Sequence, residues 1–75
     1  MNNDRRKALQ ELSYMLCDLQ GKLASLRDEE QDCFYNMPAY FKLGKKGEKE
    51  QEAIECLSSA CDDLSNVIDS INNAI

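Results

Sequence analysis

Leucines recur along residues 9–26 with spacings that alternate between three and four. An average spacing of 3.5 keeps them on one side of a helix, as at the a and d positions of a heptad repeat. The same rhythm returns between residues 54 and 75. The two apolar seams are Leu9, Leu12, Leu16, Leu19, Leu23 and Leu26, and Ile54, Leu57, Cys61, Leu64, Ile68, Ile71 and Ile75. Two seams of similar length predict two helices packed on each other.

The break between the seams contains Pro38, Gly44 and Gly47. Proline disfavours the helical conformation at the residue before it, and glycines punctuate helices. The pattern predicts one domain over residues 1–75, with a helix at 4–36, a link at 37–47 and a helix at 48–74. Such a link favours an antiparallel turn. The predicted fold class is therefore all-α, a two-helix antiparallel coiled-coil hairpin.

Within the link, Pro38 can open a single short turn of helix. Tyr40, Phe41 and Leu43 are expected to fold back and cover the open end of the apolar seam. Burial of these large side chains would add to a core that two helices alone leave small.

Two hairpin registers give mostly apolar layers. The preferred register sets Leu19 opposite Cys61 and Glu30 opposite Glu50, outside the apolar layers. A register shifted by one heptad instead sets Glu30 against Leu57. We prefer the first, because an unpaired carboxylate within an apolar seam is costly.

A chain of 75 residues buries only ~60% of the surface that its unfolded form exposes, so self-association or a partner is expected. The second helix carries a further column of small apolar residues at every seventh position. Either the first helix covers this column, or it packs against a second copy to form a dimeric four-helix bundle. We assign it to self-association, and its members are Ala53, Ala60, Val67 and Ala74.

The first helix has a second stripe, formed by Tyr14, Cys17, Gly21 and Ala24. A glycine inside a helix costs ~1 kcal/mol relative to alanine, so Gly21 calls for an explanation. Either another protein approaches the helix closely here, or the glycine is tolerated on a solvated face. We assign this stripe to a protein partner.

The four cysteines lie at four different heptad positions, and the chain has no histidine and no Cys-x-x-Cys motif. Zinc sites need ligands that converge, so we predict neither a metal nor a cofactor. Cys33 and Cys61 are predicted to be small core residues, and Cys17 to be exposed or at an interface.

The chain carries a net charge of -5. The acidic candidates are Asp28, Glu29, Glu50, Glu52 and Glu55. They form either a solvated surface balanced by lysines or a surface that imitates a nucleic-acid backbone. The acidic balance argues against direct binding of nucleic acid. Because no triad, phosphate loop or calcium loop occurs, we predict that the chain is not an enzyme.

No long apolar run is present, so no membrane span is predicted. The charged start has no apolar stretch typical of a signal peptide, which predicts a cytoplasmic protein.

Several short segments carry a resemblance. They are Asn-Asn-Asp-Arg-Arg-Lys-Ala-Leu at 2–9, Arg-Asp-Glu-Glu-Gln-Asp at 27–32, Asn-Met-Pro at 36–38, Gly-Glu-Lys at 47–49 and Glu-Ala-Ile-Glu-Cys-Leu at 52–57. The chain resembles small helical-hairpin proteins encoded by phages and prophages of Gram-positive bacteria. It departs from them in its four cysteines and in Tyr40 and Phe41. The resemblance implies a phage origin, the cytoplasm of a bacterial host as location, and a host or phage protein as partner.

Three functions remain open at this point. The first is a protein–protein interaction module that dimerises, and that binds and inhibits a host protein through a helical face. The second is an acidic decoy against a host defence nuclease, similar in action to an anti-CRISPR protein. The third is an oligomer that sequesters a small ligand between its subunits.

Overall fold

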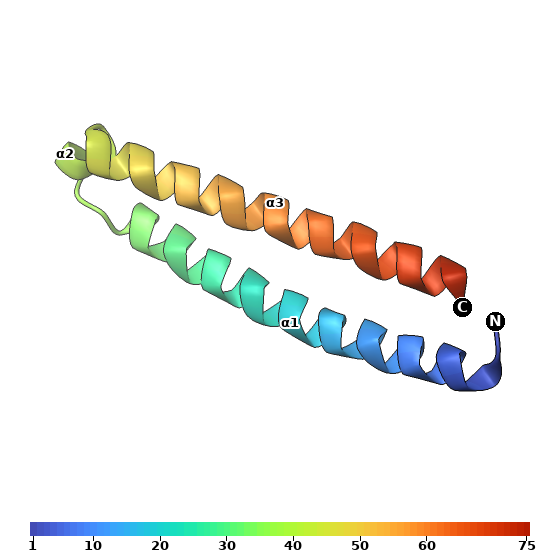
Figure 1. Ribbon diagram of the computed structural model, residues 1–75. Coiled ribbons are helices and arrows are strands. Elements are labelled where there is room, and N and C mark those ends of the chain that lie inside the picture. Colours follow the sequence, from blue (N-terminus) through green and yellow to red (C-terminus); the bar gives the residue numbers. More distant parts are fainter.

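The computed structural model describes residues 1–75 and contains three helices and no strand: α1 (Asn3–Tyr35), α2 (Ala39–Lys42) and α3 (Lys45–Ala74). Figure 1 shows α1 and α3 running antiparallel beside each other, with both ends of the chain at one end of the rod and α2 at the other. The rod measures 58 × 14 × 11 Å. The all-α hairpin predicted from the two seams is confirmed.

The first helix begins directly after its N-cap residue, Asn2. Asn2 has an extended backbone, and its side-chain Oδ1 accepts a hydrogen bond from the Arg5 backbone N–H at 2.8 Å. This bond satisfies one of the N–H groups that every helix start leaves free. The helix ends at Tyr35, shortly before Pro38.

The link contains the short helical turn expected after Pro38, which is the N-cap of α2. The third helix, however, begins at Lys45 and not at residue 48. Gly44 is its N-cap, and the Gly44 carbonyl accepts the Glu48 N–H at 3.2 Å.

Gly47, predicted to belong to the link, lies inside the helix and is buried. A Cβ on Gly47 would lie 2.7 Å from Lys42 Cα, so this glycine permits close packing of α2 on α3.

The apolar seam of α1 differs from the prediction. Leu12, Leu19 and Leu26 are 50%, 53% and 54% exposed. The buried or half-buried positions that alternate by four and three are Leu9, Ser13, Leu16, Gln20, Leu23, Arg27, Glu30, Phe34 and Met37. One column of the predicted seam, Leu9, Leu16 and Leu23, is kept, and the other moves forward by one residue. Because successive residues of a helix are ~100° apart, the centre of the seam moves by half of that angle. The first helix is therefore rotated by roughly 50° about its axis relative to the prediction.

Hydrogen bonds between the long helices account for this rotation. The Ser13 hydroxyl donates to Asn72 Oδ1 at 2.9 Å. The Gln20 side-chain amide donates to the Cys61 carbonyl at 2.9 Å and to Ser65 Oγ. These bonds hold the polar flank of α1 against α3 and turn the exposed leucines away from the interface.

The alignment along the rod follows the preferred register. Glu30 faces Glu50, close enough for a hydrogen bond between their side chains. Gln20, one residue after Leu19, is the residue that meets Cys61. The two helices are therefore aligned along the rod as predicted, whereas the rotation of α1 about its own axis differs from the prediction.

The core of the hairpin is thin. Four residues of 75 are buried: Ser13, Gly47, Cys61 and Ile68. Cys61 is in the core as predicted, whereas the prediction for Cys33 was wrong, because the rotation of α1 places this residue on the surface.

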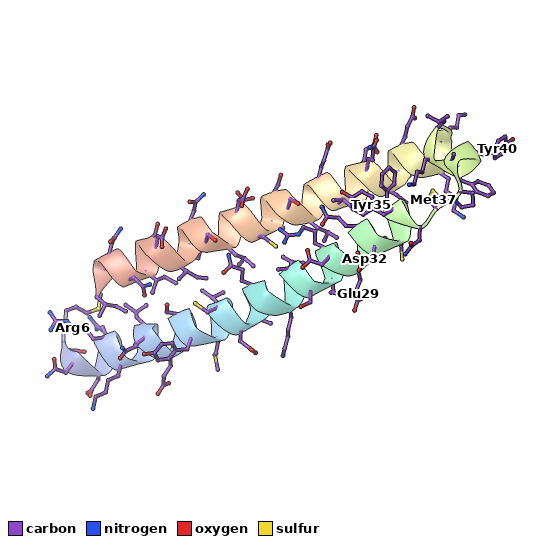
Figure 2. The ribbon with its side chains drawn as sticks, turned by 180° about the vertical axis from the view of Figure 1, so that it is seen from behind. Arg6, Glu29, Asp32, Tyr35, Met37 and Tyr40 are labelled. Carbon is purple, nitrogen blue, oxygen red and sulfur yellow. The ribbon has the colours of Figure 1, made fainter.

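The aromatic link does not cover the seam. Tyr40 and Leu43 are 84% and 89% exposed, and Phe41 is exposed as well. The Tyr40 and Phe41 rings contact each other edge to face at 5.5 Å, and Lys46 Nζ lies 5.2 Å from the Phe41 ring centre. The close contact of Gly47 with Lys42 holds α2 beside the start of α3, so Tyr40 projects from the tip of the hairpin (Figure 2).

Candidate interaction surfaces

Side-chain hydrogen bonds connect α1 and α3 along one side of the hairpin but not along the other. Ser13 and Gln20 bond to Asn72 and Ser65 along one flank of the seam. Helical periodicity places the exposed leucines of α1 and the small-residue column of α3 on the opposite flank. We call this surface the open face, and its residues are Leu12, Met15, Leu19, Leu26, Ala53, Ala60, Val67 and Ala74.

The column predicted for self-association lies mostly uncovered on the open face. Ala53, Val67 and Ala74 are exposed, and Ala60 is half-buried. The first helix therefore does not cover this column, which was the alternative that the sequence left open. A shallow hollow lies beside it near the open end of the hairpin, lined by Leu9, Asn66, Val67, Ser70, Ile71 and Ala74.

The sequence did not predict that the leucines of α1 would join this surface. The heptad spacing of Leu12, Leu19 and Leu26 fits burial against α3 as well as it fits burial against another chain. A signal was nevertheless present in the polar residues that immediately follow two of these leucines, Ser13 and Gln20, because both can form hydrogen bonds across the seam.

The stripe predicted to bind a partner lies on another side of α1. Tyr14, Cys17 and Gly21 are exposed, while Ala24 is half-buried. The Tyr14 hydroxyl accepts a hydrogen bond from the Gln10 side-chain amide at 3.3 Å. No atom would lie within 4 Å of a Cβ on Gly21, so no contact within the chain explains this glycine.

The acidic candidates divide into two groups. Asp28, Glu29, Glu52 and Glu55 are exposed, and Asp28 forms an ion pair with Arg27 at 3.2 Å. Glu50 is half-buried and faces Glu30 across the seam. The hydrogen bond with Glu50, the repulsion between the two carboxylates and partial desolvation together raise the pKa of Glu30.

The environment of Glu50 agrees with this raised pKa. Its Oε2 atom is buried and no ordinary donor reaches it. Two ionised carboxylates only accept hydrogen bonds, so a bond between them requires a proton on one of the pair. A protonated Glu30 can donate this bond to Glu50, in keeping with the raised pKa of Glu30.

The remaining chemical groups are dispersed. All four cysteines are free thiols, and three of them, Cys17, Cys33 and Cys56, are exposed. No three Cys, Asp or Glu side chains come together in an arrangement that could hold a metal ion. Two further hollows, beside Phe34 and beside Phe41, are shallow and open to solvent.

Comparison with known proteins gives no relative: no family model, no curated protein and no solved structure matches the chain. None of the three helices combines the length and the apolar character needed to span a bilayer.

Proposed function

We propose that this chain is a non-enzymatic protein–protein interaction module. The observation that supports the proposal is that few residues are buried while many large apolar side chains are exposed. Only four residues are buried, whereas several large apolar side chains, among them Leu12, Met15, Leu19 and Leu26, are at least half-exposed. Contiguous apolar surface of this kind on a small chain marks sites of protein association.

The two helical faces have different tasks in this proposal. The open face serves self-association into a homodimer with a four-helix bundle. The stripe of Tyr14, Cys17, Gly21 and Ala24 then remains accessible to a foreign protein. The free space around Gly21 lets a helix or loop of that protein approach the α1 backbone closely.

The resemblance to phage-encoded hairpin proteins supplies the class of target. On this proposal the partner is a protein of the bacterial host, and binding inhibits it. The chain acts in the cytoplasm of the host cell, without a metal or cofactor and without binding nucleic acid itself.

A second candidate function is an acidic decoy of a defence nuclease. It is favoured by the exposure of Asp28, Glu29, Glu52 and Glu55, which leaves a row of carboxylates accessible near the tip of the hairpin. Basic residues interspersed in the same region, such as Arg27 and Lys49, reduce its likeness to a uniformly charged phosphate backbone.

Capture from a bacterial lysate under reducing conditions separates the two candidates. We expect the wild-type chain to retain a specific protein that Gly21→Leu loses at least roughly tenfold, since the leucine side chain occupies the approach to the helix. Space is free at Gly21, so the variant should fold. Asn73→Leu, an equivalent change at an exposed position of α3, is the matched control and should bind normally.

The second arm reverses charge at Asp28, Glu29, Glu52 and Glu55. The interaction module predicts that capture survives this change, whereas a decoy predicts that capture is lost and that Gly21→Leu has no effect. If the wild-type chain retains no protein beyond those retained by both variants, both candidates are wrong.

A further inference from the structure

We infer that a second copy of this chain packs on the open face, related by a two-fold axis parallel to the long axis of the rod. In this dimer α1 of one copy lies against α3 of the other, and both hairpin tips point the same way. The inference rests on the interaction role proposed above and defines the arrangement of its homodimer.

The exposed area is sufficient for such a dimer. The chain exposes 5747 Å². A compact monomer of 8.5 kDa exposes about 4,650 Å². The excess of about 1,100 Å² arises from the rod shape and exceeds the ~800 Å² that each partner contributes to an ordinary stable interface.

The hydrogen bonds within the hairpin fix which residues lie at the same level along the rod. Gln20 lies level with Cys61 and Ser65, and Glu30 lies level with Glu50. It follows that Leu19 lies level with the segment between Ala60 and Val67. By the same alignment, Leu12 and Leu26 lie level with the gaps on either side, Val67 to Ala74 and Ala53 to Ala60 respectively.

A two-fold axis parallel to the rod leaves these levels unchanged between copies. Each exposed leucine of α1 therefore meets a gap between two small residues of the partner's α3. Large side chains inserted between small ones give the interdigitation of well-packed helices. No sliding of the chains is needed, because the register within one hairpin already determines the register between two.

The alternative two-fold axis, perpendicular to the rod, fits less well. It stacks α1 on α1 and α3 on α3, so leucines meet leucines while the alanine column faces another alanine column. Helix pairs with such different side-chain sizes require different separations. A rigid hairpin held by the Ser13 and Gln20 bonds cannot satisfy both.

Opposite charges meet at one end of the rod in this dimer. Figure 2 shows Arg6 near the start of α1, and Glu29 and Asp32 toward its end. The dimer sets the acidic end of α1 beside the start of the partner's α3, where Lys45, Lys46 and Lys49 alternate with Glu48, Glu50 and Glu52. The basic start of α1 lies beside the part of the partner's α3 that has no basic residue. Exposed pairs of this kind contribute little affinity, so the choice of axis rests on side-chain size.

The mass in solution tests the dimer, by light scattering over a concentration series with reductant present. We expect the wild-type chain to have twice the monomer mass, and Leu19→Lys to weaken dimerisation by at least roughly a hundredfold, since two buried charges enter each dimer. Tyr14→Lys, the matched control on another side of α1, should remain dimeric. A monomeric wild-type chain, or a Leu19→Lys variant that still dimerises, overturns the inference.

A size exchange tests the arrangement. Leu19→Ala and Ala60→Leu should each weaken the dimer roughly tenfold or more, the first through a lost contact and the second through a clash. The double variant should recover most of the affinity, because the leucine at position 60 then fills the space that Leu19 leaves in the other copy. Helicity and thermal unfolding of each variant at low concentration show whether the monomer fold is kept. Failure of the double variant to recover, with the fold intact, overturns the parallel axis.

This outcome is independent of the foreign partner. Leu19→Lys that is monomeric and still captures a protein from lysate supports the dimer and the interaction role separately. A wild-type monomer with normal capture overturns only the dimer. A wild-type dimer without specific capture contradicts only the binding of a foreign protein.

Discussion

The two glycines inside the long helices have opposite surroundings. Gly47 is buried against the backbone of Lys42, whereas Gly21 has open space around it. Neither has a positive φ, so conformational freedom of the backbone explains neither residue. The difference lies in what the missing side chain would meet.

Gly47→Ala should therefore destabilise the hairpin by about 1–3 kcal/mol, since the added methyl group displaces the Lys42 backbone and α2 with it. Chemical denaturation followed by circular dichroism measures this change. Gly21→Ala is the matched control and should have the opposite sign, a gain of ~1 kcal/mol from helix propensity. Equal effects of the two substitutions would contradict the contact between Gly47 and Lys42.

The Glu30–Glu50 pair gives a pH dependence of known sign. Because contact with Glu50 raises the pKa of Glu30, the folded chain binds this proton more tightly than the unfolded chain does. The stabilisation is fully present below the ordinary glutamate value of 4.5 and is lost as the pH rises through the raised pKa.

Glu30→Gln should remove this dependence. At pH 7 we expect the variant to unfold at a higher temperature than the wild-type chain, because an amide does not repel Glu50 and can donate to it. Near pH 4.5 the difference should shrink. Melting curves at both pH values test this, with the exposed Glu52→Gln as control. A difference that is independent of pH would show that the two carboxyl groups do not interact in solution.

At the scale of the helices, a few polar contacts decide how α1 is rotated against α3. Gln20 donates two hydrogen bonds to α3, and Ser13 is more deeply buried than any leucine of α1. Without these bonds, the predicted seam that includes Leu12 and Leu19 would bury more apolar surface within one chain. The rotation thus lowers the apolar area buried within the hairpin and leaves apolar side chains exposed on its open face.

Gln20→Ala should cost about 1–3 kcal/mol of unfolding free energy, since two part-buried hydrogen bonds between the long helices are lost. Denaturation at a concentration below dimerisation isolates the effect within one chain. The control is Gln10→Ala on the same helix, where the amide reaches only the exposed Tyr14 hydroxyl, and it should change stability by less than about 0.5 kcal/mol. A neutral Gln20→Ala would mean that apolar packing alone sets the rotation.

At the scale of the whole molecule, the rod limits the shapes that an assembly can take. One chain is 58 Å long, and the open face extends along most of it. The exposed tip of the rod, with Tyr40 and Leu43, is the other apolar surface through which copies could meet.

Small-angle scattering distinguishes association through these two surfaces. Packing on the open face should double the mass while the largest dimension stays close to the 58 Å of one chain. Packing tip to tip should roughly double the length as well. A long particle would contradict the open-face dimer and assign Tyr40 and Leu43 to self-association.

The sequence by itself determined the helical content, the antiparallel hairpin, the level of one helix against the other and the small-residue column of α3. Heptad spacing and the Pro38 break depend only on local periodicity and backbone chemistry, so they are readable without coordinates. The pairing of Glu30 with Glu50 followed from the same register.

Only the tertiary structure decided the rotation of α1, and with it the exposure of Leu12, Leu19, Leu26 and Cys33. It also decided that Gly47 belongs to α3 and that the aromatic link projects from the tip. Heptad spacing does not determine the rotation of a helix about its axis. A rotation of roughly 50° changes which residues of the other helix each side chain contacts, although the spacing of the apolar residues in the sequence is the same. Polar side chains such as Ser13 and Gln20 fix that rotation, and their partners are apparent only once both helices are placed.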